Sequence, residues 1–143
     1  MRLDAILAGA AITATGGQGG AASGRTGTAG AGGHGNTGLL GGGPGTDAIT
    51  AKGGDSGTVA PNASPGRPGD GNANGADVLA RGGNDTLELV RGRRNPDGNP
   101  AAANAGDVDG GAPRPTETNI CVLVGPDTGT VVDCEKRMVE DPA

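Results

Sequence analysis

The sequence predicts a mostly irregular or disordered glycine-rich chain with a few short β-strands and a C-terminal β-hairpin. Three observations lead to this fold class. The 143 residues include 32 Gly and 10 Pro, and they include no Phe, Tyr or Trp. Leu, Ile and Val together number only 21, which is below the level typical of a packed core. We therefore expect too little apolar burial to offset the conformational entropy of ordering the chain.

Residues 1–22 are expected to be a signal peptide or a short N-terminal helix. Met1 and Arg2 precede an apolar run, AILAGAAITA, at residues 5–14. The run has the length of the hydrophobic region of a signal peptide, and small residues that suit cleavage follow it. Asp4 fits this interpretation poorly because it places a negative charge beside the run. No stretch approaches the roughly 18 apolar residues of a membrane-spanning helix.

Residues 16–116 are expected to form a glycine-rich, low-complexity region with weak repeats. Glycine recurs every third residue from 24 to 33, and again in a shifted register from 32 to 41. This period suits polyproline II helices, in which only Gly fits at a crowded contact. The stretch resembles the glycine-rich antifreeze proteins, and the resemblance implies packed polyproline II helices. A flexible linker is the favoured interpretation.

A short apolar motif followed by Gly-Gly occurs three times in the chain. Residues 11–17 read AITATGG, residues 48–54 read AITAKGG, and a looser copy, DVLARGG, begins at Asp77. Each copy is interpreted as a very short strand followed by a tight turn. The unequal spacing of the copies argues against a strict solenoid. A ragged β-solenoid or a polyproline II bundle is the alternative fold.

Residues 117–143 are predicted to form a small C-terminal β-hairpin. Ile120–Val124 and Thr130–Cys134 read as strands on either side of the turn GPDTG. Cys121 and Cys134 are the only cysteines and lie symmetrically about that turn. Antiparallel pairing would place them opposite each other, within reach of a disulfide. The pair is therefore a disulfide candidate, which favours a secreted protein.

Residues 74–89, NGADVLARGGNDTLEL, resemble the calcium-binding nonapeptide repeats of RTX proteins. The resemblance implies oxygen ligands from Asp77, Asn84 and Asp85, with Asp47 and Asp55 in the partner segment. The aspartates of this stretch lie eight residues apart rather than nine. We therefore predict no metal site and no cofactor.

A search for catalytic groups finds none, and the protein is predicted not to be an enzyme. His34, the only histidine, lies in the glycine-rich tract with no acidic residue near it in sequence. The two cysteines lack zinc-ligand spacing, and no phosphate-binding glycine motif is present. The net charge of −5 and the missing aromatic residues argue against nucleic-acid binding.

The expected function is that of a non-enzymatic structural or surface protein, secreted or exposed on the cell surface, whose glycine-rich front self-associates. The alternative is a precursor or binding module whose C-terminal hairpin is the active part. The cluster Arg91, Arg93 and Arg94 fits the cleavage pattern of furin-like proprotein convertases, although a solvated basic linker is favoured. The sequence does not identify a protein partner.

Overall fold

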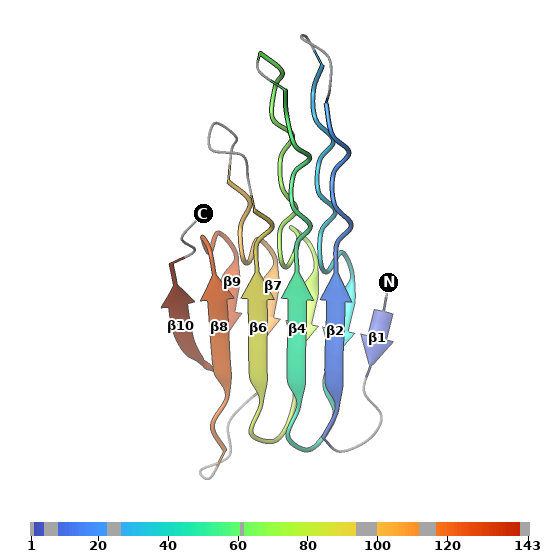
Figure 1. Ribbon diagram of the computed structural model, residues 1–143. Coiled ribbons are helices and arrows are strands. Elements are labelled where there is room, and N and C mark those ends of the chain that lie inside the picture. Colours follow the sequence, from blue (N-terminus) through green and yellow to red (C-terminus); the bar gives the residue numbers. More distant parts are fainter. Residues whose placement is uncertain are drawn as a thin grey trace.

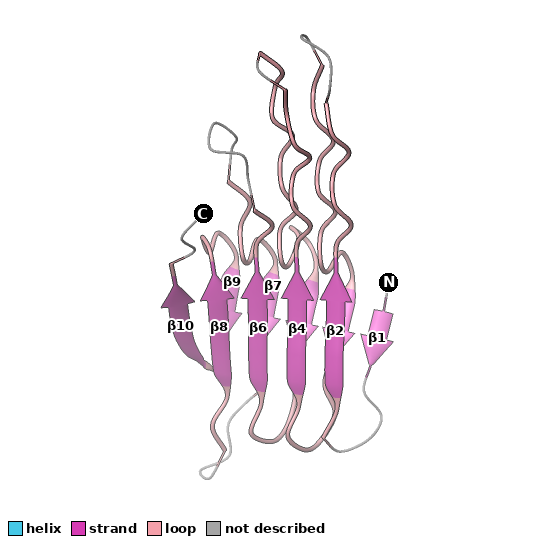
Figure 2. Cartoon of the chain, in the orientation of Figure 1, coloured by secondary structure: helices cyan, strands magenta, loops and turns pink. Residues whose placement is uncertain are grey.

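The computed structural model contains strands and no helix among the residues that it describes. These are 2–4, for which only the backbone is described, 9–22, 27–60, 62–93, 100–111 and 117–140. The strands form two sheets of five strands each (Figure 2). All neighbouring strands within each sheet run parallel.

Consecutive strands alternate between the two sheets. Sheet A contains β1 (Arg2–Asp4), β3 (Leu39–Gly41), β5 (Asp77–Leu79), β7 (Asp107–Asp109) and β9 (Thr130–Val132). Sheet B contains β2 (Ala11–Thr15), β4 (Ala48–Lys52), β6 (Thr86–Val90), β8 (Ile120–Val124) and β10 (Glu135–Val139). Each coil therefore gives one strand to each sheet, and the coils stack side by side (Figure 1). This architecture is a β-solenoid.

The interior between the sheets consists of columns of equivalent residues. In β2, β4, β6 and β8 the second and fourth residues are buried, while the others are exposed or half-buried, as expected for strands with one inner face. The strand register stacks the second residues into one column: Ile12, Ile49, Leu87 and Cys121. The fourth residues form another: Ala14, Ala51, Leu89 and Leu123. Sheet A adds Leu40, Val78 and Val108 to the same core.

The prediction of a mostly irregular or disordered chain is wrong. The described part of residues 16–116 lies within the stacked coils or in segments bonded to them, and its strands contribute most of the core. The solenoid that the sequence analysis kept as its alternative describes this architecture better. The comparison of apolar burial with chain entropy gave too little weight to backbone hydrogen bonds. Backbone hydrogen bonds between successive coils connect the glycine-rich segments, which have few apolar side chains.

The third copy of the repeated motif forms a strand, as predicted, but it is not the structural equivalent of the first two copies. β2 and β4 pair residue for residue, from Ala11 with Ala48 to Thr15 with Lys52. The equivalent of β4 in the next coil is β6, whereas the looser copy forms β5 of the other sheet. Equivalent residues preceding β2, β4 and β6 are separated by 37 and 38 positions, so these coils have nearly constant length.

The predicted C-terminal hairpin is also wrong. β8 pairs in parallel with β6 and β10, and β9 pairs with β7 in sheet A. Residues 125–129 therefore carry the chain from one sheet to the other instead of reversing it within one sheet. At the N-terminus, Ala11–Thr15 forms the short strand that the repeated motif predicted, so the alternative of a helix is wrong for these residues. Residues 1 and 5–8 lie outside the described residues, and the signal peptide stays a prediction.

Two long glycine-rich connections project from one end of sheet B, and we call them arm 1 (residues 16–38) and arm 2 (residues 53–76). Figure 1 shows them side by side, each with an outgoing and a returning limb. In the outgoing limb of arm 1, the N–H groups of residues 16, 19 and 22 donate to carbonyls of residues 52, 55 and 58. The bonds recur every third residue, the period of a polyproline II helix. The favoured flexible linker is therefore wrong here.

The shifted glycine period marks two bonded faces of the returning limb of arm 1. Gly30 and Gly33 donate to the carbonyls of Gly20 and Gly17 in the outgoing limb of the same arm. Gly32 and Gly35 donate instead to the carbonyls of residues 67 and 70 in arm 2. Close approach requires glycine at these contacts. A Cβ built on Gly16 would lie only 1.8 Å from the carbonyl oxygen of Gly33.

Candidate functional site

A row of three buried amides that ends in a carboxylate runs through the described part of the molecule. We call it the Asn ladder: Asn36, Asn72, Asn104 and Asp127. Asn36 Nδ2 donates to Asn72 Oδ1 at 2.9 Å, and Asn72 Nδ2 donates to Asn104 Oδ1 at 2.9 Å. Asn104 Nδ2 then donates to Asp127 Oδ1 at 3.1 Å. The three asparagines are completely buried. The Asp127 carboxylate also forms an ion pair with Lys136 Nζ, which neutralises the end of the ladder.

Local turns position the ladder before the strands of sheet A. The Oδ1 atoms of Asn36, Asn104 and Asp127 each accept the N–H of the glycine two residues later. Such Asx turns fix the side chain against its own backbone. The sequence carries a signal for them, since the three sites read NTG, NAG and DTG ahead of a strand. Sequence reasoning missed these residues because they were not compared across the unequal connections.

A second ladder, the Asp ladder, lies directly before the strands of sheet B and consists of Asp47, Asp85 and Asn119. Asp47 accepts the N–H of Ala10 at 2.8 Å, and Asp85 accepts the N–H of Asp47 at 2.8 Å. Asn119 accepts the N–H of Asp85 at 3.0 Å. Each side chain thus satisfies a backbone donor of the preceding coil. The buried amide donors near the start of these strands are paired in this way.

Asp85 is the least satisfied member of the Asp ladder. Its residue is 1 % exposed, and its Oδ2 has no hydrogen-bond partner in the part of the chain that the structure describes. Burial raises the pKa of the Asp85 carboxyl to about 6, and the nearby charges of Asp47 and Glu117 also raise it. The hydrogen bond from the Asp47 backbone opposes this shift. The group therefore titrates near pH 6.

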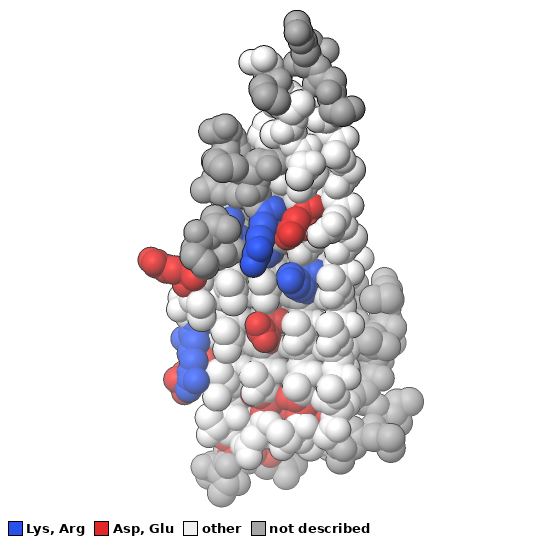
Figure 3. Space-filling view, viewed as in Figure 1, with Lys and Arg blue, Asp and Glu red and all other residues white. Residues whose placement is uncertain are grey.

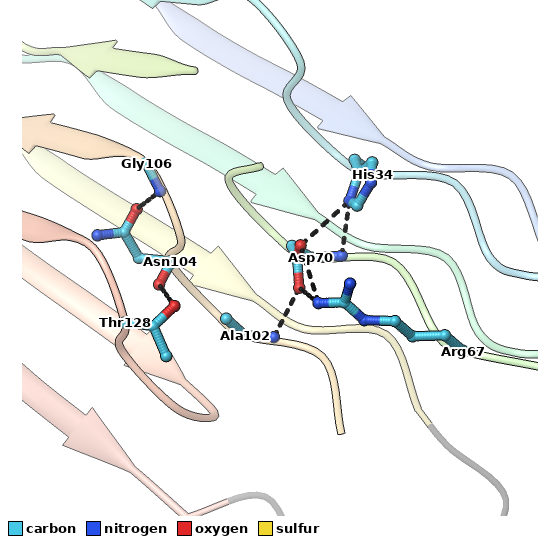
Figure 4. A network of polar contacts seen from close by, with 7 residues as sticks. All are labelled: His34, Arg67, Asp70, Ala102, Asn104, Gly106 and Thr128. Atoms are coloured by element: carbon cyan, nitrogen blue, oxygen red, sulfur yellow. Dashed lines mark hydrogen bonds and ion pairs between the residues drawn. The ribbon is translucent and has the colours of Figure 1, made fainter. Parts of the chain in front are cut away.

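The only histidine belongs to a third polar group, which contains His34, Arg67 and Asp70 (Figure 4). His34 Nδ1 accepts the backbone N–H of Asp70 at 3.0 Å and lies 3.4 Å from Asp70 Oδ2. Arg67 donates to Asp70 Oδ1 at 3.2 Å, and the N–H of Ala102 donates to the same oxygen at 2.7 Å. The fold thus supplies His34 with the acidic neighbour that the sequence did not reveal. The described contacts bring no hydroxyl or thiol to His34.

The two cysteines form a disulfide, with their Cα atoms 5.8 Å apart. Its geometry differs from the predicted hairpin, because Cys121 lies in β8 and Cys134 directly precedes the parallel neighbour β10. Register makes Cys134 the equivalent of Asn119, Asp85 and Asp47 in the earlier coils. The last coil is therefore fastened by a covalent bond where the Asp ladder fastens the others.

The remaining predicted site residues are dispersed. Of the residues implied by the RTX resemblance, Asp47 and Asp85 meet in the Asp ladder, whereas Asp77 lies in β5, Asp55 in arm 2, and Asn84 accepts the N–H of Thr118. No metal-binding cluster of His, Cys, Asp or Glu occurs among the described residues. In the predicted cleavage cluster Arg91 is buried and Arg93 exposed, while Arg94 lies outside the described residues.

Large apolar side chains are exposed at the C-terminal end of the stack, beside charged ones. Val132, Met138 and Val139 are the large apolar side chains exposed there. A shallow hollow beside β10 is lined by Arg91, Pro100, Gly125, Pro126, Met138, Val139 and Glu140. Charged side chains lie over β10, and Figure 3 shows others across the middle and the lower part of the same face.

The fold and these polar rows define a β-solenoid whose buried polar side chains bond to one another and to the backbone. No family model matches the chain, and no curated protein or solved structure is detectably similar to it. No helix in the described ranges is long and apolar enough to cross a membrane.

Proposed function

We propose that this protein is a non-enzymatic structural protein of the cell surface or the extracellular space, acting as a stiff spacer that presents its glycine-rich arms. One observation carries the proposal. The asparagine side chains of the Asn ladder are completely buried, and they form hydrogen bonds between successive coils. Such bonds stiffen a stack of coils, and they use the donors and acceptors of these side chains within the fold.

The disulfide supports the location. Cystines persist in oxidising compartments and are rare in reducing ones. The arms support the presenting role, because loops held on a rigid scaffold commonly carry the contacts of a surface protein. Self-association of the glycine-rich front, which the sequence analysis expected, is not part of this proposal.

Labelling of intact cells tests the proposal. Lys52 is exposed on sheet B, so a membrane-impermeant amine reagent should modify it without lysis. Alkylation before and after reduction, followed by mass measurement, should show that Cys121 and Cys134 are joined in the natural protein. Free thiols, together with Lys52 that reacts only after lysis, would contradict a surface or extracellular role.

A binding module centred on the C-terminal coil is the second candidate, and it keeps the earlier alternative without its hairpin. Met138 is 53 % exposed beside the hollow next to β10, and exposed apolar surface of this kind marks contact sites. Oxidative footprinting separates the candidates. A bound partner would protect Met138 in the native extract, whereas equal oxidation in the extract and in the purified protein would contradict this function.

A further inference from the structure

The two ends of sheet B differ in chemistry. Among the described residues, β2 is the outermost strand at one end and carries no charged side chain. Its inward residues, Ile12 and Ala14, are each 6 % exposed. β10 is the outermost strand at the other end, and all five of its residues are exposed. An uncharged edge strand is a template for pairing with another chain.

The backbone of both edges suits continuation of the parallel sheet. At the two ends of β2, the carbonyl of the preceding residue accepts an N–H from β4, and the N–H of the following residue donates to a carbonyl of β4. The alternate groups of Ala11, Thr13 and Thr15 therefore face the free edge. In β10 the Glu135 N–H donates to the carbonyl of the residue that precedes β8, and the Val139 carbonyl accepts the N–H of the residue that follows β8. The groups of Lys136 and Met138 therefore face the opposite free edge. A second copy could add its β2 to β10 without reversing strand direction.

One side chain opposes this addition. The register aligns Lys136 with Cys121, and so with the core column of Ile12, Ile49 and Leu87. Every earlier member of this column is a buried apolar residue. Lys136 instead holds its ammonium group against Asp127 at the end of the Asn ladder. Added β2 of a second copy would place Ile12 over this charged pair and withdraw it from water, which is unfavourable.

We propose that the C-terminal coil, residues 125–140, is a cap, and that Lys136 bars a second copy of this chain from docking its β2 edge and continuing the stack. An inward-pointing charge on an edge strand is one of the devices that prevent edge-to-edge association. Without it, head-to-tail docking would not close on itself and would produce filaments. The proposal does not depend on where the protein resides.

Replacement of Lys136 by Leu tests the cap, with Arg137→Leu as the matched control. Both changes remove one positive charge and add the same apolar side chain, but Arg137 aligns with the outward-facing Val122 and Glu88. Sedimentation velocity at increasing protein concentration is the measurement. We expect the Lys136→Leu protein to form growing head-to-tail oligomers, while the parent and the Arg137→Leu protein stay monomeric.

Two further variants keep the test decisive. Asp127→Asn combined with Lys136→Leu removes the unpaired carboxylate that the single change leaves, so it protects against a failure to fold. Thr13→Pro in the same background removes an N–H from the free edge only and should restore the monomer. A folded double variant that stays monomeric at all concentrations would overturn the proposal, as would oligomers that persist with Thr13→Pro.

Discussion

The limbs of the arms pack backbone against backbone, so a single added Cβ atom can prevent their close approach. At Gly16 the returning limb passes so closely that a methyl group would overlap the Gly33 carbonyl. At the adjacent Gly17 nothing lies within 4 Å of the same position. Neighbouring glycines therefore have different roles, one steric and one without a steric requirement.

We expect Gly16→Ala to destabilise the protein by about 1–3 kcal/mol or more, since backbone atoms would have to move. Gly17→Ala should instead be neutral or stabilise by about 0.4–1 kcal/mol, because it restricts the unfolded chain. Denaturant unfolding of both variants measures the difference. Equal destabilisation by the two changes would contradict the close contact between the two limbs of arm 1 at Gly16.

The Asp85 carboxyl makes stability depend on pH. Its pKa is raised from 3.8 to about 6 in the folded protein, so the folded state binds a proton more tightly than the unfolded state does. The stability from this group is fully present below the unfolded pKa and is lost as pH rises through 6. Asp85→Asn should flatten the stability profile between about pH 4 and 6, the interval between the unfolded and the folded pKa. Asn119 shows that an amide fits the equivalent position. The free energy of unfolding can be measured by urea titration at several pH values. A variant whose free energy of unfolding depends on pH as strongly as that of the parent would contradict this assignment.

Among the elements, β10 depends most on its fastenings because none of its side chains is buried. Its backbone bonds to β8, the Cys121–Cys134 disulfide and the Lys136–Asp127 ion pair hold it in place. β4 and β6, by contrast, are each flanked by strands on both sides and carry two core residues each. Stability should therefore fall from the middle of the stack toward the C-terminal coil.

We expect Cys134→Ala to lower the free energy of unfolding by about 2–4 kcal/mol and to release the last coil first. This variant leaves the buried Cys121 side chain in the core, so packing is little changed. Native-state hydrogen exchange should show loss of protection in β9 and β10 with protection retained in β4 and β6. Uniform loss across all strands would mean that the last coil is not an independent unit.

On the scale of the whole molecule, the sequence revealed local features better than it revealed their combination. The sequence showed that AITAT and AITAK form strands and that the two cysteines could form a disulfide. It also showed the three-residue glycine period. A strict solenoid was not predicted because the motif copies have unequal spacing. The strand equivalent to β2 and β4 is Thr86–Val90, and not the copy that begins at Asp77. The Asn ladder was missed because its members lie 36, 32 and 23 residues apart, and only stacking shows that they are equivalent.

The three-residue bonding period of the arms has a consequence for how such a protein can vary. An insertion of one or two residues in a limb would move every later glycine away from the carbonyl that it faces. An insertion of three would preserve the phase, provided that the opposite limb gained three as well. An arm can therefore become longer or shorter only by three residues at a time, with the same change in both of its limbs.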